Sequence, residues 1–135
     1  MADVDPVRTD LISRWERVLA GAPEVHEAVL WAEEEMDSFE WRDEVTLQGL
    51  NWLHDLWNYP RRELDDNSRE RCSAIYQAWR EEVSRFEADP VEWNRNYALG
   101  FVRRLPESMR ERAASDFVRD GMLTDRDSVE FRFNN

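Results

Sequence analysis

Few side chains in this chain are suited to metal binding or covalent catalysis. It has two histidines, His26 and His54, and one cysteine, Cys72. Helical zinc and di-iron sites need paired ligands at fixed spacings, such as His-Glu-x-x-His or two Glu-x-x-His motifs. Neither histidine belongs to such a motif, because three apolar residues follow His26 and Glu27 where a second ligand is needed. The sequence therefore predicts no metal site.

Cys72 and the carboxylates do not indicate a catalytic site either. Cys72 falls on the apolar stripe of a predicted helix, where a lone cysteine behaves as a small buried hydrophobic residue. The carboxylates are too numerous for one pair to stand out as general acid and general base. Four glycines are too few for a phosphate-binding loop, and no dinucleotide motif is present. We expect no catalytic residue, no cofactor and no enzyme; a small enzyme with an unrecognised carboxylate site is the least favoured hypothesis.

The distribution of the carboxylates along the chain is more informative than their pairing. The 135 residues include 30 Asp and Glu against 18 basic residues, all of them arginine, for a net charge of -12. Residues 1–66 contain 17 acids and 6 arginines, whereas residues 96–135 contain 7 of each. This charge opposes electrostatic binding to DNA, RNA or an anionic membrane, so we expect none of them as a partner. The expected partner is a basic protein.

The acids are densest between residues 24 and 44, where nine of them are accompanied by a single arginine, Arg42. Carboxylates this close together repel one another and reduce stability, which suggests that a basic surface compensates them. The plainer alternative is that these acids form only the solvated face of a helix. The nine are Glu24, Glu27, Glu33, Glu34, Glu35, Asp37, Glu40, Asp43 and Glu44.

Two tryptophans lie within this acidic segment. At about 100° per residue, Trp31 falls opposite the apolar stripe that contains Val25 and Val29, and Trp41 lies a few residues further on. A large aromatic side chain surrounded by charge is typical of a binding hot spot. In the alternative, this helix packs between two layers and Trp31 is buried in the second. The predicted partner-binding residues are Glu24, Glu27, Trp31, Glu34, Glu35, Asp37, Glu40, Trp41, Asp43 and Glu44.

Helices are expected to position these residues, because apolar side chains recur at three- and four-residue steps along most of the chain. Asp89-Pro90 is a typical helix start and Gly121 a typical stop. Val129, Phe131 and Phe133 alternate with strand spacing, which predicts an extended C-terminal arm that packs on the helices or adds to a partner's sheet edge. The expected fold is all-α, a single compact bundle of about six helices forming one domain over residues 1–135, with an extended C-terminal arm. The predicted helices cover approximately residues 11–19, 25–36, 43–58, 72–86, 90–105 and 106–120.

The sequence also bears on where the protein acts. Its longest apolar run, Ala28–Ala32, is far too short to cross a membrane. Its acidic start, Met1–Pro6, lacks the basic and hydrophobic features of a signal peptide. One cysteine excludes an internal disulfide, as is usual in a reducing compartment. We expect a cytoplasmic protein.

Four short motifs follow one another between residues 11 and 57. They are Leu11-Ile12-Ser13-Arg14-Trp15, Glu24-Val25-His26-Glu27, Trp31-Ala32-Glu33-Glu34 and Asp43-Glu44-Val45. Their order resembles that of small acidic all-helical immunity proteins of the colicin D immunity type, over about a third of the chain. The resemblance implies a helical protein that binds a basic nuclease toxin through scattered acidic side chains and blocks its substrate site. No single residue role is carried over, and residues 58–135 have no counterpart.

The favoured hypothesis is an acidic inhibitor, most concretely an immunity protein (antitoxin) that neutralises a basic nuclease toxin. Its acids would occupy the groove that normally binds phosphates, and charge would steer the encounter. The alternative is a nucleic-acid-mimicking inhibitor of a DNA-binding defence protein, of the phage anti-defence type; the neutral residues 96–135 argue against the extended acidic surface that it needs. A structural oligomeric scaffold, with the C-terminal arm in a subunit interface, is a third hypothesis. The sequence does not predict the oligomeric state.

Overall fold

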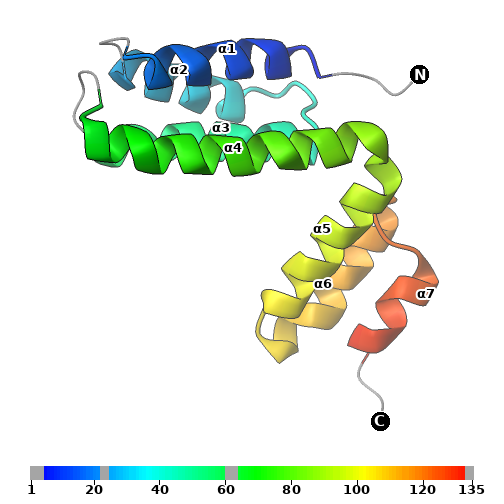
Figure 1. Ribbon diagram of the computed structural model, residues 1–135. Coiled ribbons are helices and arrows are strands. Elements are labelled where there is room, and N and C mark those ends of the chain that lie inside the picture. The colour runs from blue at the N-terminus through cyan, green and yellow to red at the C-terminus, as the bar shows by residue number, and fades with distance from the viewer. Residues whose placement is uncertain (1–4, 22–24, 60–63, 133–135) are drawn as a thin grey trace. The chain divides into compact units, whose positions relative to one another are not determined.

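The chain folds into helices joined by short connections (Figure 1). The computed structural model describes residues 5–21, 25–59 and 64–132, and every regular element in these ranges is helical. The predicted all-α fold is thus confirmed. None of the described helices has both the length and the apolar composition that crossing a bilayer requires. The elements are α1 (Val7–Leu19), α2 (Val25–Asp37), α3 (Glu44–His54), the 3₁₀ turn η1 (Asp55–Asn58), α4 (Asp66–Ala88), α5 (Pro90–Arg104), α6 (Glu107–Arg119), α7 (Asp125–Ser128) and the 3₁₀ turn η2 (Val129–Phe131).

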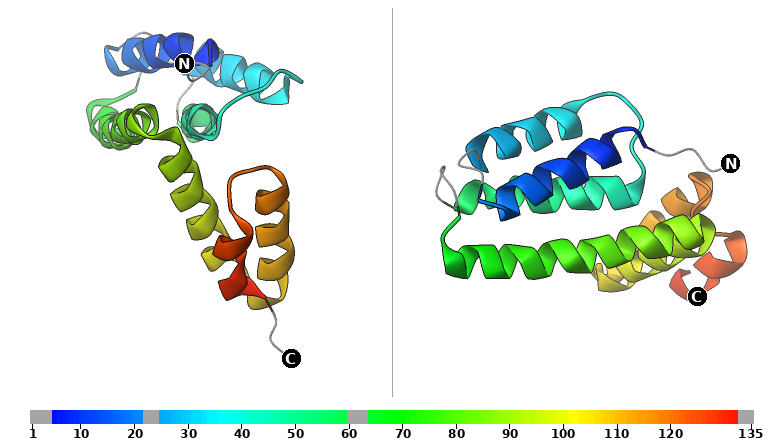
Figure 2. Two further views of the ribbon diagram at one scale, coloured as in Figure 1. Left: turned by 90° about the vertical axis from the view of Figure 1, so that its right-hand side faces the viewer. Right: turned by 45° about the horizontal axis from the view of Figure 1, so that its top comes forward.

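Contacts within the chain define two compact units, Met1–Val83 and Ser84–Asn135. That both belong to one domain stays a prediction. In the first unit, α1, α2 and α3 are in mutual contact, and Figure 2 shows them side by side. Gly21, with a φ of 96°, stops α1 in a conformation that glycine adopts readily. The predicted apolar stripes supply the buried faces of α1 and α2, whereas in the helix predicted over 43–58 Trp52 and Trp57 are exposed. The buried residues are Leu11, Trp15 and Val18 in α1, Val25, Ala28, Val29 and Ala32 in α2, and Val45, Leu50 and Leu53 in α3.

Large aromatic side chains of α4 complete the core of the first unit. The Trp79 indole nitrogen donates a hydrogen bond of 2.8 Å to the carbonyl oxygen of Val45 in α3. The Tyr76 ring stacks on Trp15 of α1, with 5.6 Å between the ring centroids. Space for the Trp79 ring comes from Gly49 of α3, because a β-carbon there would overlap the indole. Because Gly49 has no side chain, Trp79 of α4 can pack directly against α3 at this position.

The second unit is a smaller helical group with its own core. Asp89 caps α5 by accepting a hydrogen bond of 3.1 Å from the Glu92 amide, and Pro90 follows as the first helical residue, as predicted. α5 and α6 lie side by side, and α7 and η2 contact α6 (Figure 1). The buried cluster of this unit consists of Ala98, Leu99, Val102, Ala114, Leu123 and Phe131.

The last described residues differ from the predicted extended arm. Thr124 and Asp127 form a capping box, in which each side chain accepts a hydrogen bond from the other residue's amide. This box starts α7, and the chain continues into η2, so residues 125–131 are helical. Phe131 is buried in the core of the second unit, whereas Phe133 lies outside the described residues. The prediction of an arm was wrong over this segment, because the local cap outweighs the alternation of apolar residues.

The close fit at Gly49 predicts opposite effects for two glycine substitutions. Gly49→Ala should lower the free energy of unfolding by about 1–3 kcal/mol, because the new methyl group must displace the buried Trp79 ring. Gly100→Ala in α5 should raise it by about 0.5–1 kcal/mol, because the nearest side-chain atom, on Arg104, is 3.8 Å away and alanine favours the helix. Urea unfolding of both variants measures these changes, and equal effects would contradict this packing of α4.

The environment of Tyr76 predicts how stability depends on alkaline pH. Burial, and a hydrogen bond of 3.1 Å from its hydroxyl to the Glu16 carboxylate, raise the pKa of Tyr76 from 10.0 to about 12. The folded state thus holds this proton more tightly than the unfolded chain, so a stabilisation present below pH 10 is lost as pH rises through 12. This loss should amount to roughly 2–3 kcal/mol, at about 1.4 kcal/mol per pKa unit. Phenolate absorbance and urea unfolding follow it; a Tyr76→Phe variant with the same pH dependence as the wild type would refute it.

Candidate partner-binding surface

Asp43 lies inside the first unit rather than on its surface. One carboxylate oxygen accepts a hydrogen bond of 2.8 Å from the Thr46 amide, which caps the start of α3. The other lies 2.6 Å from Nη1 of Arg8 in α1, and both side chains of this ion pair are only 4% exposed. Asp43 therefore has a structural role and is left out of the candidate surface, although its position in the sequence had placed it among the partner-binding residues.

Asp5 and Arg42 extend this buried network around the Ser38–Asp43 loop, which joins α2 to α3. The fully buried Asp5 carboxylate accepts a hydrogen bond of 3.1 Å from the Asp43 amide. Nη2 of Arg42 donates a hydrogen bond of 2.7 Å to Glu35 at the end of α2. The loop is therefore fixed to α1, α2 and α3, and the charge of the half-buried Glu35 is neutralised within the protein.

Five other acids of the segment are exposed on α2 and the loop after it, and we call them the acidic surface. Glu40 lies 3.7 Å from Nη2 of Arg42, but its side chain is 79% exposed. For the other four, no ion pair is found within the described ranges. Of the remaining predicted site residues, Glu44 is half-buried in the first turn of α3, and Glu24 lies outside the described residues. The acidic surface consists of Glu27, Glu33, Glu34, Asp37 and Glu40.

Two aromatic side chains project from the loop beside this surface. Trp41 is 62% exposed, in agreement with its predicted place outside the core, and Phe39 is fully exposed. Phe39 was not among the residues predicted from the sequence. Its position within the acidic segment, outside any apolar stripe, could have indicated that it is exposed. Trp31 is half-buried, between the exposed and the buried alternatives. The Arg14 guanidinium lies 4.5 Å from its ring centroid. Within the acidic segment, Phe39 and Trp41, rather than Trp31, are thus the aromatic residues accessible to a partner.

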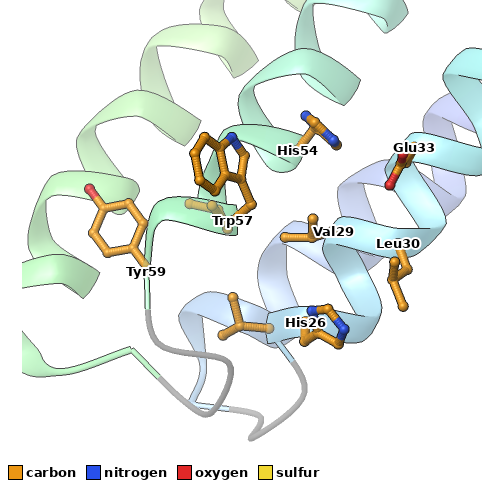
Figure 3. Close-up of a pocket in the computed structure, with 9 residues that line it drawn as sticks. His26, Val29, Leu30, Glu33, His54, Trp57 and Tyr59 are labelled. Carbon is orange, nitrogen blue, oxygen red and sulfur yellow. The ribbon is translucent and has the colours of Figure 1, made fainter.

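A cavity of about 340 Å³ adjoins the acidic surface, between α2 and the end of α3 (Figure 3). Both histidines of the chain line it, His26 from α2 and His54 from α3, together with Glu33, Trp57 and Tyr59. Among the described residues, no group of three or more side chains is arranged to hold a metal ion. The sequence did not predict this cavity, because it forms where η1 packs against α2, and the tertiary packing of a short 3₁₀ turn leaves no periodic pattern.

Cys72 is buried, as predicted, and its side chain is next to that of Tyr59. Burial raises the pKa of the Cys72 thiol, and a hydrogen bond with the Tyr59 hydroxyl opposes this only in part. The thiol therefore stays protonated at neutral pH, and a protonated thiol is a poor nucleophile. Its environment supports a packing role.

These features identify a surface but do not name a family. No family model, curated protein or solved structure matches this chain. The resemblance to immunity proteins over residues 11–57 thus stays a prediction, and the case for a function depends on the chemistry of the acidic surface and its aromatic neighbours.

The buried Arg8–Asp43 pair predicts a large stability loss when one charge is removed. Arg8→Met keeps most of the side-chain volume but leaves Asp43 without its counter-charge, which should cost about 3–5 kcal/mol in the free energy of unfolding. Glu40→Gln removes an exposed carboxylate from the edge of the same network and should change stability by less than about 1 kcal/mol. Urea unfolding distinguishes the two, and a mild effect of Arg8→Met would contradict the structural role of Asp43.

Proposed function

We propose that this protein is an acidic inhibitor that binds a basic partner protein and covers its substrate site, as an immunity protein neutralises a nuclease toxin. The observation that carries the proposal is the acidic surface, five exposed carboxylates of α2 and its loop beside the exposed Phe39 and Trp41. The protein acts as a binding protein rather than an enzyme, and its site of action is the cytoplasm.

Charge supports a basic partner. Residues 1–83 contain 20 acids and 9 arginines, whereas residues 84–135 contain 10 acids and 9 arginines, so the excess of negative charge belongs almost entirely to the first unit. A nuclease binds phosphates in a groove lined by positive charge. Carboxylates on α2 fit such a groove, and their field accelerates the encounter of the two proteins. The nearly neutral second unit argues against a nucleic-acid mimic, which needs acids over a more extended surface.

The fixed loop favours a high affinity for the partner in addition to fast association. Large aromatic side chains supply most of the binding energy in many interfaces, with charged residues around them. Phe39 and Trp41 lie on a loop that Arg42 and Asp43 tie to three helices, so little conformational freedom is lost when a partner covers them. The acidic surface would thus accelerate association with the partner, and the two aromatic residues would supply most of the binding energy.

A scaffold is the second candidate, because large apolar side chains are exposed elsewhere on both units. Exposed apolar groups often bury a subunit interface. Association through them would be insensitive to salt, whereas binding through the acidic surface weakens as salt screens the charges. The exposed residues are Trp52 and Trp57 in the first unit and Val91, Phe101, Met109 and Val129 in the second.

Charge reversal on α2 should strongly reduce capture of the partner. The affinity-tagged chain is incubated at low salt with an extract of its native host, and the retained proteins are quantified by mass spectrometry. The Glu27→Arg/Glu34→Arg variant should retain at least about tenfold less of a basic protein than the wild type, because both changes place repulsive charge at the contact. Trp41→Ala should also reduce retention about tenfold through loss of contact.

The matched control reverses two exposed acids of the second unit, Glu107→Arg/Asp120→Arg, which changes the net charge by the same amount. This control should retain the basic protein as the wild type does. Equal losses in both double variants would show that only net charge matters and would contradict the proposed surface. Recovery of the chain alone, at low and at high salt, would favour the scaffold.

A further inference from the structure

The cavity beside the acidic surface combines an apolar base with aromatic and polar walls. Val29 of α2 and Leu56 of η1 line it and are themselves buried. Trp57 is 62% exposed, and Figure 3 shows its ring on the η1 side of the cavity, whereas Glu33 comes from α2 on the other side. His54, at the end of α3, lies between them in this view. An occupant would therefore contact an indole ring, a carboxylate and an apolar surface.

Among the described residues, the one fully charged side chain that lines this cavity is the carboxylate of Glu33. Glu33 is exposed, and no ion pair is found for it within the described ranges. Among the described residues that line the cavity there is no arginine, and the other titratable groups are His26, His54 and Tyr59. Glu34, the next residue on the exposed side of α2, does not line the cavity. A cation is favoured here and an anion disfavoured.

We propose that this cavity binds one arginine side chain of the basic partner. A guanidinium is planar, weakly hydrated and rich in donors, so it can stack on an aromatic ring while it pairs with a carboxylate. Trp57 supplies the ring and Glu33 the carboxylate, and the methylene groups of the arginine cover Val29 and Leu56. The compact, strongly hydrated ammonium of lysine suits this combination less well. A volume of about 340 Å³ is small for a ligand site, where about 300–1,000 Å³ is usual, and suits a single side chain.

The proposal rests on the proposed function, since it takes the partner to be basic, but its test needs no partner. The probe is a blocked tripeptide, acetyl-Gly-Arg-Gly-amide, titrated into the full chain and followed by NMR. His26 and His54 are the only histidines, so their imidazole signals report on this cavity alone. The arginine peptide should shift them with an affinity in the millimolar range. A peptide with citrulline, which has the same shape without the charge, should bind several-fold more weakly, as should the lysine peptide.

Matched variants separate the cavity from its surroundings. Glu33→Gln should weaken binding of the arginine peptide about threefold, as expected for an exposed ion pair, whereas Glu34→Gln should leave it unchanged. Trp57→Leu should abolish the shifts, whereas Trp52→Leu, an exposed tryptophan outside the cavity, should not.

Three results would overturn the proposal: no shift of either histidine, equal binding of the citrulline peptide, or equal effects of Glu33→Gln and Glu34→Gln. Each can be distinguished from failure of the proposed function, which is measured by capture of the partner. Arginine binding without capture would leave the cavity assigned and the inhibitor role refuted. Capture without arginine binding would refute the cavity alone.

Discussion

The buried contact between Arg8 and Asp43 is the interaction on which the proposed surface depends. An ion pair removed from water is stable only where hydrogen bonds satisfy its groups. Here the same Asp43 carboxylate caps α3 through the Thr46 amide, and the Asp43 amide donates to the Asp5 carboxylate. Because these bonds are directional and join α1 to the start of α3, they determine the path of the Ser38–Asp43 loop. The exposure of the loop's aromatic residues therefore follows from a contact in the interior.

This network divides the acids of the segment into two groups. Asp43 and Glu35 are neutralised by Arg8 and Arg42 and hold the fold together. Within the part of the chain that the structure describes, four of the five carboxylates of the acidic surface have no ion pair, and neighbouring members repel one another along α2. The buried stripe of α2 and its contacts with α1 and α3 allow the helix to tolerate this repulsion. A basic partner would relieve it, which is why the outward group, and not the whole acidic segment, is the proposed binding surface.

The elements could be predicted from the sequence because their signals are local. Apolar stripes indicated the helices, and the Asp89-Pro90 cap indicated the start of α5. The burial of Asp43 could not be predicted, because it depends on Arg8, 35 residues away in the sequence. The position of Trp31 likewise depends on Arg14, in another helix. The cavity depends on the packing of η1 against α2, which no periodic pattern encodes.

The central claim is that the outward acids of α2 draw a basic protein to this surface. The most direct test is the rate constant of association with the captured partner, measured by stopped flow over a range of salt concentrations. For the wild type the rate should fall steeply as salt screens the charges, and for Glu27→Arg/Glu34→Arg it should be slower at low salt and depend much less on salt. The same rate and the same salt dependence in both proteins would contradict the account.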